Sequence, residues 1–262
     1  MAESRSDYLA QLPSTCCIGG SIHEGTPIGS EEQVAGITTY VARPPTGVTA
    51  NGNVVFFLPD IWGLANNSKL LIDGFAAAGY VALGMDYFRG DPISKYRSSH
   101  DAKPPPDFDM EAWRVKHFSF ATDNVPVWVD AAKTIYGTTG SRYGCVGYCF
   151  GAPFVANLLA GDAVSAGAVA HPTQLKEGHF RAVKKPLFLS CAEHDRAFGP
   201  EPRRRAIDIL QETKVSYHLQ LFCNVNHGFA SRGNLTDLYE KWVKEQSHRG
   251  ITDWFNFWLS QN

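Results

Sequence analysis

One pentapeptide in the sequence combines residue types that suit nucleophilic catalysis. Gly147-Tyr148-Cys149-Phe150-Gly151 follows the G-x-S-x-G pattern of a nucleophile elbow, with cysteine in place of serine. The elbow is a strand-to-helix turn so tight that side chains at its two flanks clash, and it holds the nucleophile in a strained backbone conformation. The following helix N-terminus favours a thiolate. The pattern predicts that Cys149 is a nucleophile, and the alternative interpretation is a glycine-rich turn with a buried, inert cysteine.

A nucleophile of this kind needs a base and an acid, and both are found later in the chain. Asp195 and His227 each follow a predicted strand, in the order nucleophile, acid, base that goes with the elbow. We predict that His227 takes the proton of the cysteine and that Asp195 orients the histidine. Glu193 is an alternative acid because the spacing from the strand end does not distinguish the two, and His194 lies close by.

Attack by a thiolate on an ester or lactone carbonyl gives an oxyanion that two hydrogen-bond donors must stabilise. In an elbow the first donor is the backbone N–H after the nucleophile, here that of Phe150. The second donor comes from the loop after an earlier strand, and we expect it to be the backbone N–H of Ile61.

The elements that must position these residues alternate between strands and helices along most of the chain. This alternation predicts an α/β fold with a mostly parallel central sheet and helices on both faces. Functional loops then gather at the carboxyl ends of the strands. The predicted strands are 37–43, 54–58, 81–85, 143–146, 166–170, 187–192 and 217–222, and the predicted helices are 68–78, 121–136, 152–160, 203–213, 238–246 and 251–259.

Composition limits the kind of protein. Hydrophobic residues make up 44% of the 262 residues, as in an ordinary globular protein, and the formal net charge of −2 gives no basic field for nucleic acid. Residues 1–12 lack the apolar core of a secretory signal, and the apolar run 54–58 is too short to cross a bilayer. We therefore expect a cytoplasmic protein that binds neither nucleic acid nor a membrane.

The cysteines and histidines give no metal-binding pattern. The six cysteines form no paired C-x-x-C motif, and H-E-x-x-H does not occur. Cys16 and Cys17 are neighbours, and a disulfide between them would be strained. We expect no metal and no other cofactor.

Taken together, the motifs resemble those of the dienelactone hydrolase family. The resemblance implies an α/β-hydrolase fold, a triad of Cys149, His227 and Asp195, and hydrolysis of lactones or esters without a cofactor. It covers a single domain, 36–262, and an N-terminal extension, 1–35, resembles the fungal branch of the family. The segments that carry it are VVFFLPDIWGL (54–64), GYVALGMDYFRGDP (79–92), GYCFGAP (147–153), AEHD (192–195) and NHGFASR (226–232).

The resemblance also implies supporting residues. A carboxylate after the first core strand contacts the resting cysteine or its partners in the family; it is usually Glu in bacterial members and is the shorter Asp60 here. Members that cleave dienelactones hold a substrate carboxylate with arginines. Ser231 fills the place of one of these and Arg232 is the next residue, while Arg89 is a second candidate.

Several side chains near these motifs are candidates for the substrate pocket. Trp62, Tyr148 and Phe229, together with Phe150, indicate an apolar or aromatic acyl site, with ordinary core packing as the alternative. His171 follows the predicted strand 166–170 and is expected to line the same pocket or to be a structural histidine. The loop-like segment 88–110 leaves open whether a lid covers the site.

These observations predict a hydrolase of a small-molecule ester or lactone, monomeric or homodimeric. Two other functions stay open. The same triad can serve acyl transfer, or a cyclisation or lyase step in a secondary-metabolite pathway, if water does not reach the thioester. A non-catalytic α/β binding protein that kept the elbow is the third interpretation, although nothing in a binding role needs Cys149, Asp195 and His227 together.

Overall fold

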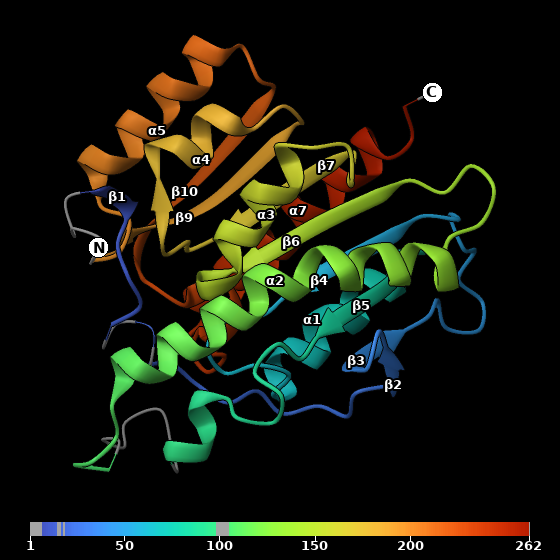
Figure 1. The fold of residues 1–262 in the computed structure, drawn as a ribbon, viewed down its shortest axis with the longest axis horizontal. Helices are drawn as coiled ribbons and strands as arrows, with labels where there is room; N and C mark the ends of the chain where they lie inside the picture. The colour runs from blue at the N-terminus through green and yellow to red at the C-terminus, as the bar shows by residue number, and fades with distance from the viewer. Residues whose placement is uncertain (1–6, 15–16, 18, 98–104, 262) are drawn as a thin grey trace.

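The computed structural model describes residues 7–14, 17, 19–97 and 105–261 (Figure 1). Its main feature is a sheet of eight strands in the order β10-β9-β7-β6-β4-β5-β3-β2. In chain order these strands are β2 (Ser30–Val34), β3 (Ile37–Ala42), β4 (Val54–Leu58), β5 (Val81–Met85), β6 (Tyr143–Tyr148), β7 (Ala166–Ala170), β9 (Leu187–His194) and β10 (Tyr217–Asn226).

The sheet is mostly parallel, as predicted. From β5 through β4, β6, β7 and β9 to β10 every pairing is parallel, whereas β3 runs antiparallel to β5, and β2 runs antiparallel to β3. The parallel pairs are joined by crossovers that contain helices, and the antiparallel pair β2–β3 by a short turn, as these two pairing types require. The helices are α1 (Asn66–Ala77), α2 (Met110–Tyr136), α3 (Ala152–Leu159), α4 (Glu177–Ala182), α5 (Pro200–Thr213), α6 (Phe229–Arg232) and α7 (Leu238–Trp258).

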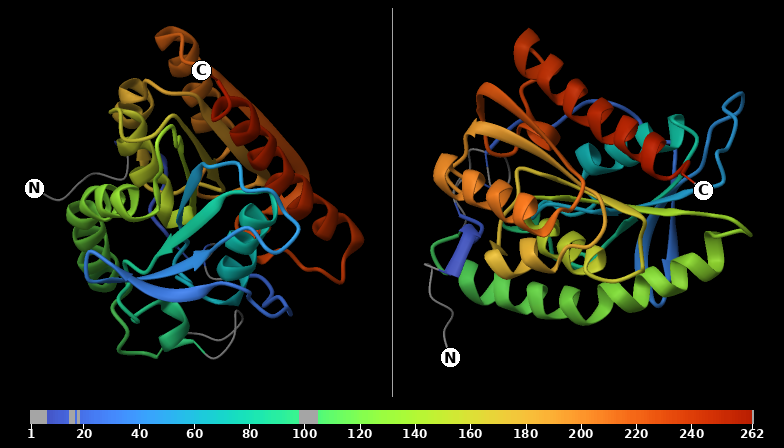
Figure 2. Two further views of the ribbon diagram at one scale, coloured as in Figure 1. Left: turned by 90° about the vertical axis from the view of Figure 1, so that its right-hand side faces the viewer. Right: turned by 90° about the horizontal axis from the view of Figure 1, so that it is seen from above.

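Helices cover both faces of the sheet, with α1 and α7 on one face and α2 and α3 on the other (Figure 2). The central strand β4 shows why both faces are filled. Its successive side chains point to opposite faces, so Phe56 packs edge-on against Trp128 of α2, whereas Phe57 stacks on Tyr148. All five residues of β4 are buried, which is the expected pattern for a strand covered on both sides.

Two predicted helices are in fact one, and that prediction was wrong. The stretches 238–246 and 251–259 form the single helix α7, with Gly250 in its interior. A Cβ atom at Gly250 would lie 2.8 Å from Gln220 Oε1 and 3.0 Å from the Phe188 ring. The glycine therefore permits close packing of the helix on β9 and β10 and does not mark a helix end.

Several other elements are longer than predicted. The helix predicted from residue 121 begins at Met110, where the Asp109 carboxylate accepts hydrogen bonds from the N–H groups of Glu111 and Ala112. This is the usual N-cap arrangement. The strands predicted to end at 192 and 222 continue to His194 and Asn226, which carries them to the edge of the candidate site.

The N-terminal segment lies along the carboxyl ends of the parallel strands. Strand β1 (Tyr8–Ala10) pairs with the short strand β8 (Leu175–Lys176). Gln11 N–H donates to Ala197 O at 2.7 Å, and Ser21 N–H donates to Arg232 O at 2.8 Å. Residues far apart in the sequence are therefore brought to the functional edge of the sheet. The boundary at residue 35 between an extension and a domain stays a prediction.

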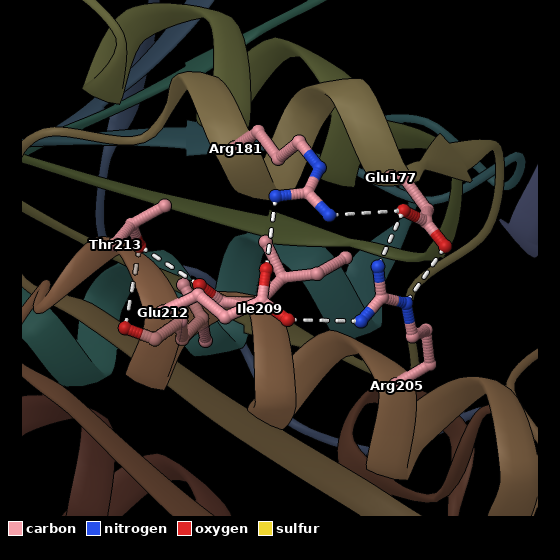
Figure 3. Close-up of polar contacts among 7 residues, drawn as sticks. Glu177, Arg181, Arg205, Ile209, Glu212 and Thr213 are labelled. Carbon is pink, nitrogen blue, oxygen red and sulfur yellow. Dashed lines mark hydrogen bonds and ion pairs between the residues drawn. The ribbon is translucent and has the colours of Figure 1, made fainter.

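A set of exposed charges joins α4 to α5 on the outer surface (Figure 3). Glu177 accepts from Arg205 at 2.8 and 3.0 Å, and Glu212 pairs with both Arg205 and Arg181 at 3.1 and 3.0 Å. These four side chains are 37 to 49% exposed. They form a solvated network rather than a binding site.

Of the residues that the structure describes, no helix has the length and apolar character needed to span a membrane.

The segment 88–110, a possible lid over the site, is described only in part. Residues 98–104 lie outside the described residues. The residues before them include the short helix η3 (Ile93–Tyr96). Whether the segment forms a lid stays open.

Candidate active site

Cys149 occupies a strained turn between β6 and α3, as the elbow pattern predicts. Its φ angle is +49°, a left-handed value that side-chain-bearing residues rarely adopt. A Cβ atom at Gly147 would lie 2.7 Å from the backbone of Gly151, and one at Gly151 would lie 2.2 Å from Leu58 O. Both glycines are therefore required by the close approach of backbone to backbone, and they hold the cysteine at the carboxyl end of β6.

His227 and Asp195 form a buried hydrogen-bonded pair at the ends of β10 and β9. Nδ1 of His227 lies 3.0 and 2.9 Å from the two carboxylate oxygens of Asp195. Asp195 Oδ1 also accepts the backbone N–H groups of Ala197 and Phe198 at 2.8 and 3.1 Å. These bonds fix the carboxylate, which in turn orients the imidazole ring.

The alternative acid, Glu193, has a different role. Its side chain is 45% exposed, and its carboxylate accepts the backbone N–H of Asn224 at 2.8 Å. It also lies 3.6 Å from His194. Asp195 is therefore the carboxylate that faces His227, and Glu193 joins the ends of strands β9 and β10 at the surface.

The thiol of Cys149 lies within 4.8 Å of a ring nitrogen of His227, and the same is true of a third residue, Cys17. All three residues are buried. Cys149 Sγ also lies 3.9 Å from the hydroxyl of Thr173, whose backbone N–H donates to Cys149 O at 3.1 Å. Neither Cys17 nor Thr173 was predicted at the site. The pair Cys16-Cys17 was a visible signal, but its local sequence does not show where it packs, and Cys16 lies outside the described residues.

The charges around His227 affect its protonation strongly. Burial by itself lowers the pKa of His227, but the negative charges of Cys17 and Asp195 outweigh burial and raise the pKa well above its ordinary value. Burial raises the pKa of Asp195, yet the charge and hydrogen bond of His227 bring the pKa of this carboxyl below its usual range. The histidine is accordingly stabilised as an imidazolium, the form that pairs with a thiolate.

His171 lies beside His227 and is completely buried. The two rings are 4.9 Å apart, and the His171 ring is 5.8 Å from the rings of both Tyr148 and Phe229. Complete burial, followed by the charge of His227, lowers the pKa of His171 well below its ordinary value. His171 is therefore a neutral ring packed against the candidate base, and its part in the substrate pocket stays a prediction.

Asp60 and Arg232 face each other in a buried ion pair. Asp60 Oδ2 accepts hydrogen bonds from the Arg232 guanidinium and from Ser231 Oγ, and Oδ1 accepts Trp62 N–H at 2.8 Å. The two charged side chains are 2 and 1% exposed. In this structure the Asp60 carboxylate forms its ion pair with Arg232 and not with the Cys149 thiol. The predicted contacts of Asp60 with the cysteine and of Arg232 with substrate stay predictions, and both would require this pair to rearrange.

The remaining candidates line separate hollows, except that Trp62 and Arg232 share a small one of about 220 Å³. Arg89 and Trp62 line a cavity of about 1000 Å³, in which the Arg89 guanidinium lies 4.2 Å above the Phe120 ring. A cleft of about 610 Å³ is lined by His227 and Phe229 together with Arg232. Arg89 is thus placed in a different hollow from the candidate base.

Phe150 and Ile61, the predicted oxyanion donors, have buried side chains. The Phe150 ring packs among the aromatic rings of the core, 5.2 Å from Phe88 and 5.8 Å from Phe154. It is therefore a core side chain and not a pocket wall, and its predicted part in catalysis concerns the backbone N–H. Ile61 O accepts Ile93 N–H at 3.0 Å, which fixes the loop that would carry the second donor.

Fold and site together define a class of protein. A mostly parallel sheet carries a cysteine at a strand-to-helix elbow, and a histidine and an aspartate follow at the ends of later strands. This is the arrangement of the α/β-hydrolase fold.

Comparisons with known proteins agree with this class. The model of the dienelactone hydrolase family matches residues 37–259. "Dienlactone hydrolase 1" and "Dienlactone hydrolase 2" of Gibberella moniliformis are each 43% identical, over 100% and 97% of this chain and 100% and 99% of their own. "Hydrolase pyvD" of Aspergillus violaceofuscus is 38% identical over 95% of this chain and 98% of its own. The chain therefore belongs to the dienelactone hydrolase family, and with it to the hydrolases of esters and lactones.

Solved structures agree on the fold. A putative dienelactone hydrolase from Klebsiella pneumoniae has a TM-score of 0.66 at 15% identity and covers 90% of this chain and 99% of its own. A dienelactone hydrolase-like promiscuous phosphotriesterase from metagenomic libraries has a TM-score of 0.67 at 17% identity, over 89% of this chain and 99% of its own. At these identities the likeness concerns the fold alone.

Proposed function

We propose that this protein hydrolyses a lactone or carboxylic ester of a small molecule through a thioester on Cys149. The observation that carries the proposal is the position of the Cys149 thiol at the elbow, within 4.8 Å of a His227 nitrogen. Asp195 binds the opposite side of the same ring, at Nδ1. Family membership supports the reaction class.

In the first half of the proposed reaction, His227 takes the proton of the Cys149 thiol, and the thiolate attacks the carbonyl carbon. The carbon–sulfur bond forms as the carbonyl π electrons move to oxygen. When the oxyanion collapses, the carbon–oxygen bond to the leaving group breaks, and the imidazolium gives its proton to the departing alkoxide. With a lactone, the new hydroxyl stays attached to the acyl chain.

In the second half, water takes the place of the leaving group. His227 removes a proton from the water, and the resulting hydroxide attacks the thioester carbonyl. The carbon–sulfur bond then breaks, and the thiolate leaves as the carboxylic acid forms. Asp195 stabilises the imidazolium in both halves and does not itself take up the proton.

The oxyanion of each half requires donors that are already in place. We assign them to the backbone N–H groups of Phe150 and Ile61, which belong to the elbow and to the loop after β4. Backbone donors held by buried neighbours need no reorganisation as charge develops, and one such donor is typically worth about 10²–10³ in kcat.

The substrate site is proposed to have an aromatic wall and to select small, flat acyl groups. Tyr148, His171 and Phe229 pack together beside His227. An anionic substrate would need Arg232 or Arg89, and loss of kcat/KM for an acidic lactone in Arg232→Ala or Arg89→Ala, but not for a neutral lactone, would identify it. Unchanged kcat/KM for the acidic lactone in both variants would exclude this recognition.

The deciding experiment is hydrolysis of p-nitrophenyl acetate, one dienelactone and one neutral aryl lactone by wild type and Cys149→Ala. We expect turnover of at least one substrate by wild type and none by the variant. Equal activity of the two proteins would refute the assignment of Cys149. A control with Cys145→Ala, which removes a buried thiol outside the elbow, separates loss of the nucleophile from a packing defect.

An independent readout is the rate of alkylation of Cys149. A nucleophilic thiolate reacts faster than an inert thiol. Iodoacetamide labelling followed by peptide mass spectrometry measures this rate for each cysteine. Labelling of Cys149 no faster than that of the exposed Cys223 would contradict the activated nucleophile.

A further inference from the structure

Cys17 lies beside the catalytic pair and has no part in the proposed hydrolysis. The thiols of Cys17 and Cys149 and a ring nitrogen of His227 all lie within 4.8 Å of one another. Cys17 and Cys149 are both 0% exposed. The reaction uses only two of these three groups, so a role for the third has to be sought elsewhere.

The spacing of the three groups suits a single metal ion. Zinc binds cysteine sulfur at about 2.3 Å and histidine nitrogen at about 2.0–2.1 Å, so donors in a tetrahedral site lie about 3.4–3.8 Å apart. The three donors already lie within 4.8 Å of one another, so a bound ion would have to draw them only slightly closer together.

The kinds of donor indicate which ion would bind. Two thiolates and an imidazole favour zinc and other cations of similar softness, whereas magnesium and calcium prefer oxygen ligands. Asp195 holds Nδ1 of His227 at 2.9–3.0 Å, which leaves Nε2 as the nitrogen that can bind an ion. A carboxylate on the second nitrogen of a ligating histidine is a usual feature of zinc sites, where it fixes the ring and raises its basicity.

One member of this buried cluster, His227, lines the surface cleft of about 610 Å³. The cleft is also lined by Gly19, Gly20 and Ser21. These residues belong to the same N-terminal segment as Cys17. The segment therefore supplies both a donor and one wall of the cleft beside the cluster.

We propose that Cys17, Cys149 and His227 form a binding site for zinc, or for another divalent cation of the same softness, with Asp195 orienting the histidine. Binding displaces the protons of the two thiols, and three protein ligands leave the fourth position to water. An ion bound in this way coordinates both the nucleophile and the base, so hydrolysis stops until the ion dissociates. Only this inhibition rests on the proposed function; binding of the ion does not.

The primary test is cobalt(II) binding to chelator-treated protein kept reduced with a phosphine. Cobalt in a site with thiolate ligands gives a sulfur-to-metal charge-transfer absorption that grows with the number of thiolates. We expect this absorption in wild type, its loss on adding zinc, and about half of its intensity in Cys17→Ser, since one of two thiolates is removed. We also expect zinc to bind Cys17→Ser at least about tenfold more weakly.

Cys223→Ser is the matched control, because Cys223 is an exposed thiol outside the cluster. Its spectrum should equal that of wild type. The proposal would be overturned if wild type gave no such absorption. It would also be overturned if Cys17→Ser left the absorption unchanged, or if Cys223→Ser abolished it. Magnesium should give no competition, and equal competition by magnesium would also overturn it.

A measurement without mutation covers the case in which Cys17→Ser does not fold. X-ray absorption at the zinc edge of loaded wild-type protein should give two sulfur scatterers at about 2.3 Å and one imidazole. Fewer than two sulfurs would exclude the site. If zinc binds in this way but the protein hydrolyses no ester or lactone, the metal site stands and the proposed function fails.

The inhibition has its own readout. Zinc should suppress wild-type hydrolysis reversibly, with recovery on adding a chelator. Each variant is compared with its own zinc-free rate, and Cys17→Ser should require at least about tenfold more zinc for the same fractional loss. Equal zinc sensitivity of Cys17→Ser and wild type would show that Cys17 is not a ligand.

Discussion

The charged groups at the carboxyl edge of the sheet and those between α4 and α5 are of the same types but differ in exposure. At the edge, Asp60 and Arg232 are 2 and 1% exposed. On the outer surface, Glu177 and Arg205 are 43 and 37% exposed (Figure 3). Both pairs have close contacts, so geometry alone does not distinguish them. The consequence of breaking a pair therefore depends on whether water can replace the lost partner.

In the buried region, the charges are satisfied by hydrogen bonds from the protein. Asp60 is bound by Arg232, Ser231 and the backbone of Trp62. Removing one member leaves a buried charge without its partner. On the surface, solvent and salt replace a lost partner at once.

The largest effect is expected from the buried pair of Asp195 and His227, the proposed orienting acid and base. Asp195→Asn removes the charge that stabilises the His227 imidazolium and allows the wrong tautomer, so kcat should fall by about 10³–10⁴. Steady-state kinetics on the best substrate of the panel measures it. Glu193→Gln, which changes a nearby exposed carboxylate, should leave kcat within about twofold of wild type. A larger loss in Glu193→Gln than in Asp195→Asn would reverse the assignment of the acid.

The next effect concerns stability. Arg232→Met leaves the Asp60 carboxylate buried without its partner and should lower the free energy of unfolding by about 3–5 kcal/mol. Urea denaturation followed by tryptophan fluorescence measures the change. The double variant Asp60→Asn/Arg232→Met should recover part of the loss, because no unpaired charge remains. Additive losses in the double variant would show that the two residues do not act as a pair.

A half-buried histidine, His248, gives a smaller effect that depends on pH. Burial lowers the pKa of His248 to about 4, below the value of about 6.5 in an unfolded chain. Between these values the unfolded state binds the additional proton, so stability is fully present above pH about 6.5 and falls as the pH drops toward 4, by up to about 3 kcal/mol. His248→Gln should flatten this acid limb in a series of thermal melts. His218→Gln, at an exposed position, serves as the control. An equal flattening of the acid limb in His218→Gln would show that His248 is not its cause.

The smallest effect is expected from the surface network. Glu177→Gln breaks the ion pairs with Arg205 and Arg181, but water then solvates both guanidinium groups. The urea midpoint should shift only slightly, and 1 M salt should abolish the shift because exposed charges are screened. A loss as large as that of Arg232→Met, or one that persists in salt, would mean that exposure is not what separates the two regions.

The fold was predictable where local pattern carries the information. Apolar runs bounded by turns identified the core strands, because strands buried on both faces need continuous apolar sequence. Helix α7 was not predicted as one element, since Gly250 looks like a helix end in the sequence. Gly250 continues the helix because its missing side chain allows close contact with Gln220 and Phe188. Both residues lie far from Gly250 in the chain.

The candidate site, like the fold, could be predicted from the sequence only in part. Local patterns were enough to predict the elbow at Cys149 and the placement of Asp195 and His227, because a turn without room for side chains demands glycines and because parallel strands end at one edge. Three contacts are visible only in the folded chain: Asp195 and not Glu193 faces the histidine, Asp60 pairs with Arg232, and Cys17 lies beside Cys149. These are contacts between segments that are distant in the chain, and no local pattern encodes which buried groups meet when the segments pack.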